Sequence, residues 1–157
     1  MNINRFESIK HFLLMSSAIM LLSFTISFPA ALAEPTLTKK HKKLLQQLKL
    51  PPGFKIDYYA TKISGPRSMA IGRKGTVFVG TRSRGTVYAL IDKNRDGFAD
   101  EKIIVAKGLN MPNGIAFYQG DLYVAEVHRI LRFADIENKL RQIPKPQVVY
   151  NKLPTET

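Results

Sequence analysis

The strongest local motif that could do chemistry is residues 92–100, Asp-Lys-Asn-Arg-Asp-Gly-Phe-Ala-Asp. Carboxylates and amides at alternating positions, with a glycine at the sixth, can wrap a hard cation such as calcium. An EF-hand loop also needs a glutamate at its twelfth position, where this chain has Ile103, and flanking helices, where strands are expected here. Two interpretations stay open: a structural calcium site, or a turn whose side chains accept hydrogen bonds from their own backbone. The calcium ligands would be Asp92, Asn94, Asp96 and Asp100.

Side chains that could act in catalysis are otherwise few. His128 is the only histidine after residue 41, and a lone histidine at a strand end is more often structural. The chain has no nucleophile-elbow serine motif, no phosphate-cradling glycine loop and no dinucleotide fingerprint. Arg67, Arg82 and Arg84 could hold an anionic ligand through forked hydrogen bonds. For Arg82 and Arg84 the alternative is a solvated loop charge.

The elements that must position these residues are indicated by an internal repeat. Residues 66–80 and 112–125 share a proline, an alanine, a turn glycine and a three-residue apolar run at matching places. A period of about 45 residues built from short β-type runs is typical of a β-propeller blade. We therefore expect an all-β fold, a propeller fragment of about two four-stranded blades within residues 51–157.

Alternation, β-branched and aromatic residues, and glycines at hairpins place the expected strands. Gly75 and Gly85 stand where tight hairpins need a positive φ. A lone strand is expected over residues 54–60, ahead of the first blade. The blades themselves are expected at 68–72, 76–80, 86–91 and 102–106, then at 114–118, 122–125, 128–133 and 147–150.

This strand order predicts which loops lie together. Successive connections of an antiparallel blade alternate between its two ends, so loop 92–100 should lie opposite the start of the innermost strand. The other end, called here the Arg67 end, should gather residues 66–67, 81–85, 110–113 and 126–128. A ligand site, if formed, is expected at the Arg67 end and without the aspartates of loop 92–100.

The N-terminus resembles a secretory signal peptide over residues 1–33. Arg5 and Lys10 precede an uncharged apolar run, and Ala31-Leu32-Ala33 fits cleavage after Ala33. The alternative is a retained membrane anchor, because the apolar run approaches spanning length. Cleavage predicts a periplasmic or secreted protein. The chain has no cysteine, so disulfides contribute nothing to its stability.

Basic residues follow at once, and the formal net charge of the chain is +12 at pH 7. Residues 34–50 are expected to form a basic amphipathic helix and linker that ends at Pro51-Pro52. Its charges indicate either a solvated helix face or loose contact with an anionic membrane surface. No nucleic-acid motif accompanies them, so nucleic-acid binding is not expected. The residues concerned are Lys39, Lys40, Lys42 and Lys43.

The succession of motifs resembles the glucose/sorbosone dehydrogenase family. It comprises Leu-Pro-Pro-Gly-Phe at 50–54, Gly-Pro-Arg-Ser-Met-Ala at 65–70, the Asp-rich loop, Gly-Leu-Asn-Met-Pro-Asn-Gly-Ile-Ala at 108–116 and Leu-Tyr-Val-Ala at 122–125. No single motif is specific, but their order and spacing together are. The resemblance implies the N-terminal part of a six-bladed propeller that carries pyrroloquinoline quinone (PQQ).

By this resemblance, the whole protein would be an exported quinone-dependent dehydrogenase that passes hydride from a sugar to PQQ, with a separate electron acceptor. Arg67 and Asn113 are the residues expected to touch the cofactor, although Pro112 stands where some members have a glutamine. The family's catalytic histidine is expected just after residue 157, so this chain alone is expected to be inactive. Two alternatives stay open: a non-catalytic NHL-like propeller that binds carbohydrate or protein, and a calcium-dependent propeller lactonase using Asn113 and Glu126.

Overall fold

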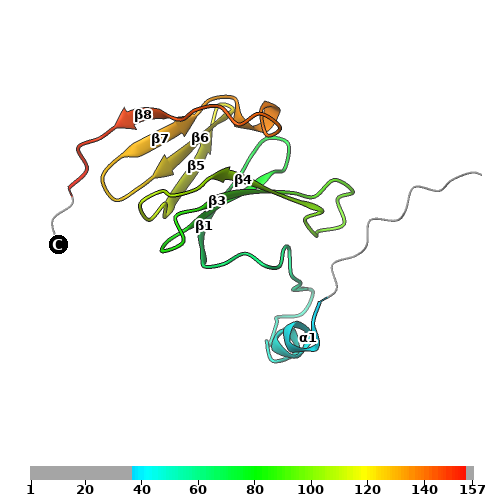
Figure 1. The fold of residues 1–157 in the computed structure, drawn as a ribbon. Coiled ribbons are helices and arrows are strands. Elements are labelled where there is room, and N and C mark those ends of the chain that lie inside the picture. Colours follow the sequence, from blue (N-terminus) through cyan, green and yellow to red (C-terminus); the bar gives the residue numbers. More distant parts are fainter. Residues whose placement is uncertain (1–36, 155–157) are drawn as a thin grey trace, which may run out of the picture. The chain divides into compact units, whose positions relative to one another are not determined.

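The computed structural model describes residues 37–154, which form one short α-helix, one 3-10 helix and two antiparallel sheets (Figure 1). The predicted signal peptide, residues 1–33, lies outside these described residues. The elements in chain order are α1 (Lys39–Gln46), β1 (Pro66–Ile71), β2 (Val77–Thr81), β3 (Val87–Ile91), β4 (Glu101–Ala106), β5 (Gly114–Tyr118), β6 (Asp121–Ala125), β7 (Ile130–Phe133), the 3-10 helix η1 (Ile136–Asn138) and β8 (Gln147–Tyr150).

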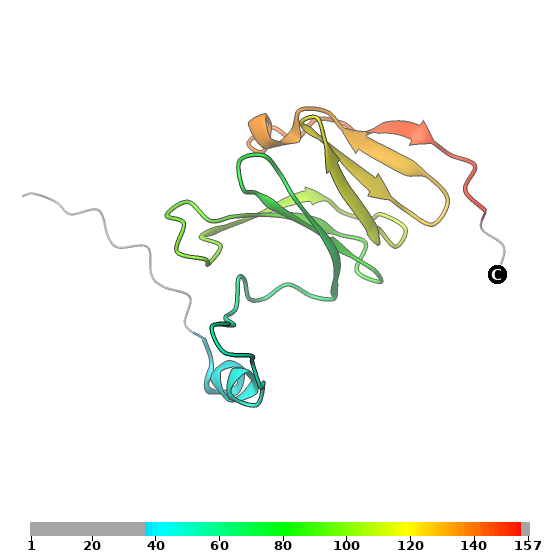
Figure 2. The same ribbon diagram turned by 180° about the vertical axis from the view of Figure 1, so that it is seen from behind.

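Each sheet is a simple meander of four consecutive strands. The orders are β1-β2-β3-β4, called blade 1, and β5-β6-β7-β8, called blade 2. Both views show the two sheets as separate layers, green for blade 1 and yellow to red for blade 2 (Figure 2). The expected all-β fold with two propeller-type blades is confirmed, as are the positive φ angles of Gly75 and Gly85.

The lone strand predicted over residues 54–60 is wrong. Its composition suits a strand, but no strand of the described chain pairs with it. Its backbone hydrogen bonds go instead to turns and loops: the Phe54 N–H donates to the Pro51 carbonyl, and the Tyr59 carbonyl accepts the Ala99 N–H. A β-run without a neighbouring strand leaves its backbone groups to water, so propensity alone does not form one.

The two blades pack through a shared apolar core. The Phe78 ring on β2 stacks on the Phe117 ring on β5, with centroids 5.8 Å apart and planes 11° apart. The cluster continues through fully or nearly fully buried residues of both blades: Val87, Ala89, Val105, Leu122, Val124, Leu131, Phe133 and Ile136. Burying a side chain of this kind stabilises the fold by roughly 1.5–3 kcal/mol. The core therefore lies between the blades as much as within either one.

The inner strands approach so closely that one position has no room for a side chain. A Cβ on Gly80 would collide with the Pro112 carbonyl oxygen and lie 2.7 Å from Ile115 Cγ1. Beside this contact, the Ser68 hydroxyl donates a hydrogen bond to the Asn113 carbonyl. The glycine in β2 thus fixes how near the loop before β5 can come to blade 1.

Ionic contacts tie the blades together at their outer parts. The Arg141 guanidinium, on the long connection before β8, donates to both oxygens of Glu101 on β4 at 2.7 and 3.2 Å. These partners and Lys93 hold the pKa of Glu101 below its ordinary value, the Lys93 hydrogen bond having the largest effect. The Lys74 backbone N–H donates to the Glu137 carboxylate at 3.1 and 3.2 Å.

Blade 2 has its own internal polar link. The buried Asp121 carboxylate accepts the Asp135 N–H at 2.8 Å and the Arg132 Nε–H at 2.6 Å. The backbone hydrogen bond from Asp135, and then Arg132, lower the pKa of Asp121. This carboxylate anchors the start of the long connection, which carries the buried Ile136 into the core.

Helix α1 confirms the expected helix only over Lys39–Gln46. The Thr38 hydroxyl caps it by accepting the His41 N–H at 3.3 Å, and the His41 ring lies 4.8 Å from the Tyr58 ring. The four lysines singled out above are exposed. Within residues 37–154, no helix combines the length and apolar character that crossing a bilayer requires.

Replacing Gly80 with valine should destabilise the full chain by about 1–3 kcal/mol, because the added atoms meet backbone that cannot move freely. The measurement is the free energy of urea unfolding. Ala116→Val, which adds two methyl groups at an exposed position of β5, should change it little. Equal effects of the two substitutions would contradict the close approach.

The lowered pKa of Asp121 predicts an acid-dependent loss of stability. A depressed folded-state pKa adds stability above the unfolded value of about 3.9, and that stability is lost as pH falls through the folded pKa. Asp121→Asn should therefore lower stability at neutral pH and flatten the decline on acidification, measured by thermal melting across pH. Glu101 should keep part of the decline. An unchanged slope in the variant would contradict the assignment.

Candidate functional site

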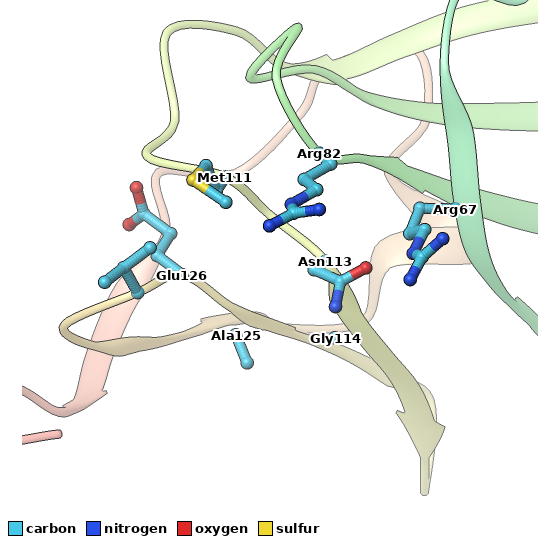
Figure 3. Close-up of a pocket in the computed structure, with 8 residues that line it drawn as sticks. Arg67, Arg82, Met111, Asn113, Gly114, Ala125 and Glu126 are labelled. Carbon is cyan, nitrogen blue, oxygen red and sulfur yellow. The ribbon is translucent and has the colours of Figure 1, made fainter. Parts of the chain in front are cut away.

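An open cavity of about 510 Å³ lies at the Arg67 end of the two blades (Figure 3). It is lined by residues from both: Arg67, Arg82, Met111, Asn113, Gly114, Ala125, Glu126 and Val127. Every segment expected at this end therefore contributes to one cavity. The prediction that these loops gather is confirmed by this arrangement.

Strand ends place the lining residues. Arg67 lies near the start of β1 and Asn113 immediately precedes β5, so the first strand of each blade places one residue at the cavity. Arg82 follows β2 and Glu126 follows β6, so the second strand of each blade places another. Because the antiparallel meander returns each second strand to the start of the first, four separate segments meet at one end.

The arginines give the cavity a positive character. Arg67 and Arg82 are exposed, and among the described residues no carboxylate forms an ion pair with either. Figure 3 shows both guanidinium groups beside the Asn113 side chain. Two forked donors and an amide can bind a carboxylate or another planar anion.

The one acidic residue of the lining, Glu126, is already neutralised. Its side chain is 1% exposed, and it accepts a hydrogen bond from Arg129 Nε–H within an ion pair. Its other oxygen accepts the Asn110 backbone N–H at 2.5 Å. In Figure 3 the Glu126 carboxylate points away from the Arg82 guanidinium. The net charge facing the cavity is therefore that of Arg67 and Arg82.

Glu126 also positions the loop that carries Asn113. Besides the bond to Asn110, the Val127 N–H donates to the Asn110 carbonyl at 3.2 Å, and the Asn113 N–H donates to the Met111 carbonyl at 2.7 Å. Met111 adopts a φ of 49°, in the left-handed region that non-glycine residues rarely enter. These bonds hold a strained loop of fixed shape at the cavity wall.

The lining supports binding more readily than catalysis. No histidine, cysteine or unpaired carboxylate of the described chain lines this cavity. His128 is not among the lining residues, and its carbonyl accepts the Leu153 N–H at 3.2 Å. That Arg67 and Asn113 touch a cofactor stays a prediction, although both now lie in one cavity.

Loop 92–100 lies away from this cavity, as expected. Asp92 lines a different hollow with Tyr59, Arg73 and Lys74, and none of these residues lines the first cavity. Burial, and then the charges of Asp92 and Asp100, raise the pKa of the Tyr59 hydroxyl. The two predicted ends of blade 1 are thus distinct.

The oxygens of loop 92–100 are engaged by the loop itself. Asp92 accepts the Arg95 and Gly97 N–H groups at 2.6 and 2.9 Å, and Asp100 accepts the Lys93 N–H at 2.6 Å. Asn94 accepts the Asp96 N–H at 3.0 Å. Between residues 37 and 154, no group of three or more histidine or acidic side chains is placed to hold a metal ion. Calcium binding by Asp92, Asn94, Asp96 and Asp100 stays a prediction.

Arg82 belongs to segment 81–85, which was expected at this end, and its exposed side chain lines the cavity. One feature of the site was not predicted from the sequence. The partner of Glu126 was not foreseen at all, although the Glu-x-x-Arg spacing across a tight turn, closed by the Glu126 N–H to Arg129 carbonyl bond at 2.9 Å, could have indicated it.

Comparison with known proteins adds one family and two partial relatives. Residues 40–142 match the family described as a domain of unknown function, DUF7133. An uncharacterized protein of Borreliella burgdorferi is 27% identical over 116 residues, covering 73% of this chain and 29% of that protein. The PQQ-bound aldose sugar dehydrogenase of Streptomyces coelicolor is 20% identical, with a TM-score of 0.48, over 63% of this chain and 34% of that structure. The chain thus spans about a third of the length of these relatives.

Glu126→Gln should loosen the loop at 110–113. The variant keeps one acceptor but loses the charge that pairs with Arg129, so we expect a loss of about 1–3 kcal/mol in unfolding free energy. Hydrogen exchange of the Asn110 and Asn113 amides should accelerate. Asp57→Asn, at an exposed carboxylate that accepts only its neighbour's N–H, is the matched control and should have little effect. Unchanged exchange in Glu126→Gln would contradict the positioning role.

Proposed function

The chain belongs to the DUF7133 family, and from this premise we propose that it forms the N-terminal two blades of an exported, quinone-dependent sugar dehydrogenase. In this proposal the Arg67 end contributes a cationic wall to the cofactor site. The sugar substrate, the electron acceptor and the remaining ligands would be met by other parts of the whole protein.

The observation that carries the proposal is the convergence of Arg67, Arg82 and Asn113 on one cavity whose only acid is already paired. Forked donors without internal partners keep their affinity for an external anion. The motif resemblance described from the sequence supports the choice of a quinone, because PQQ carries carboxylates and the site offers donors for them.

The donor set fits PQQ in part. Arg67 and Arg82 would hold a carboxylate, and the Asn113 amide would bond a further oxygen, while Glu126 and Arg129 would keep the loop in place. When bound, the quinone supplies the hydride acceptor for oxidation of a sugar carbon. The residues of this chain bind and orient; none of those lining the cavity is a base that could take up the substrate proton.

A propeller lactonase is less well supported. Its metal would need a free carboxylate beside Asn113, and both oxygens of Glu126 already accept hydrogen bonds. A propeller that binds carbohydrate or protein does not need a cationic wall. This alternative function is favoured if no anion binds to the cavity.

The proposal includes two further parts that come from the sequence alone. Residues 1–33 would direct export to the periplasm or the exterior, with cleavage after Ala33. The exposed lysines of α1 would add at most a loose attraction to an anionic membrane surface.

Isothermal titration of the full chain with PQQ tests the proposed function. We expect binding that Arg67→Gln and Arg82→Gln each weaken about tenfold or more, because a charge-assisted bond contributes about 1.5–3 kcal/mol. The matched control is Arg73→Gln, an exposed arginine of the other hollow, which should leave affinity unchanged.

Two results would contradict the proposal. Absence of PQQ binding to a folded chain would reject the quinone function for these blades. Binding that falls equally in Arg73→Gln and in the cavity variants would show a non-specific attraction to the positive chain rather than a site.

A further inference from the structure

Helix α1 and the segment that follows it leave an apolar surface open to solvent. Leu48 is 52% exposed, Phe54 69% and Ile56 44%. Apolar side chains that are exposed together mark an interaction surface. Ile56 also lines an open groove of about 570 Å³, together with Leu45, Gln46, Leu50, Lys55 and Asp57. The apolar residues of this surface are called here the α1 patch: Leu44, Leu45, Leu48, Leu50, Phe54 and Ile56.

The described residues cover little of α1. No residue of the helix is buried, and its contact with the segment after it includes the His41 ring, 4.8 Å from the Tyr58 ring. A helix of eight residues is marginal in water and gains most of its stability when its apolar side is buried. Contact of the α1 patch with a further apolar phase would supply that burial.

The charge around the patch is strongly positive. Residues 37–58 contain six lysines and one acidic residue, Asp57, whose carboxylate accepts the Tyr58 N–H at 2.7 Å. None of the six lysines forms an ion pair with a carboxylate of the described chain. A partner that carries many negative charges would therefore meet free ammonium groups.

The helix arranges these charges around its apolar side. At about 3.6 residues per turn, Leu44 and Leu45 share one side of α1, and Lys40 and Lys42 lie at the two borders of that side. Lysine side chains can lay their apolar stems along such a surface while the ammonium group stays in a polar layer. An apolar strip bordered by lysines suits a boundary between hydrocarbon and anionic groups.

The choice of lysine favours a lipid surface over a protein surface. All basic residues between positions 37 and 58, apart from His41, are lysines, and none is an arginine. Protein–protein interfaces are depleted in lysine and enriched in arginine, so a face that another part of the whole protein covers should not look like this. Four to eight basic residues on or beside an amphipathic helix are typical of binding to anionic lipids.

We propose that the α1 patch docks on an anionic lipid surface, with its apolar side chains below the headgroups and the lysines among them. An eight-residue helix is too short to cross a bilayer, so α1 lies in the plane of the surface. This inference deepens the loose attraction proposed above, because the lysines alone attract the chain and the apolar side chains hold it. It does not rest on quinone binding.

The place of the patch in the chain supports the same occupant. Residues 29–38 are all that separate α1 from the apolar run at 12–28. If that run directs export, as proposed, the patch emerges beside a membrane. This step rests on the proposed export, whereas the chemistry of the patch stands without it.

A local fluorescent label tests the docking directly. The chain has no cysteine, so Leu48→Cys can carry an environment-sensitive fluorophore at one defined position of the full chain. Vesicles of equal parts phosphatidylglycerol and phosphatidylcholine should shift its emission to shorter wavelength, and high salt should reduce the shift. The matched control label is Ser83→Cys, at an exposed residue outside the patch, whose emission should stay unchanged. Because the label reports its own surroundings, the result does not depend on whether residues 1–33 are retained.

Substitutions separate the two parts of the interaction. Leu48→Asp with Ile56→Asp, which removes apolar anchors, should weaken vesicle binding about tenfold or more. Lys42→Gln with Lys43→Gln should do the same, because each lysine near an anionic surface contributes about fivefold. The matched control for the first pair is Val148→Asp with Val149→Asp, which makes the same charge change at exposed apolar residues of β8 and should weaken binding less than threefold.

Two further measurements accompany these variants. Circular dichroism checks that each is folded. Titration with PQQ should give the same affinity in the patch variants as in the unaltered chain, because no residue of the patch lines the cavity at the Arg67 end. Loss of lipid docking and loss of quinone binding are therefore distinguishable.

Three outcomes would overturn the proposal. The label at position 48 could keep its emission when vesicles are added, which would show that the patch does not enter lipid. Its emission could already lie at short wavelength without vesicles, which would show that protein covers the patch. Vesicles of phosphatidylcholine alone could bind as tightly as the anionic ones, which would remove the role of the lysines.

Discussion

The packing of β2 against β5 is the contact on which the rest of the structure depends. This contact has two parts. The Phe78 ring stacks on the Phe117 ring, and the backbone before β5 lies directly against Gly80, which has no side chain to keep it away. Because that backbone leads directly to Asn113, the same contact sets how far Asn113 lies from Arg67 and Arg82. The cavity is therefore a consequence of how closely two sheets approach, and its charge is added by the strand ends.

The polar residues around this contact divide their roles clearly. Asp121, Glu101 and Glu126 each pair with an arginine, and all three hold loops or neighbouring strands in position. Arg67 and Arg82 have no such partner among the described residues and remain available to solvent or ligand. Because Glu126 is paired with Arg129 while Arg67 and Arg82 have no carboxylate partner among the described residues, this end of the blades is cationic.

Much of this arrangement could be predicted from the sequence because the repeat carries it. Turn glycines, the apolar runs at 77–79 and 122–124, and the antiparallel order fixed eight strands and the gathering of loops at the Arg67 end. The prediction failed at 54–60. The residues there have a high β-propensity, but a strand forms only beside a second strand, and no strand of the described chain pairs with this segment. The links of Arg129 to Glu126 and of Arg141 to Glu101 were also missed, because side-chain partners across a turn or between blades leave no periodic trace.

The contacts between the blades have a consequence for how the chain is built during synthesis. Ser68 bonds to Asn113, Glu101 to Arg141 and Lys74 to Glu137, at separations of 45, 40 and 63 residues. A nascent chain that has emerged only as far as β4 therefore exposes the apolar face of blade 1 that will later pack on blade 2. This face is covered only after the second repeat has emerged. Once that repeat emerges, all three contacts can form, so the two blades are suited to stepwise folding as the chain is synthesised.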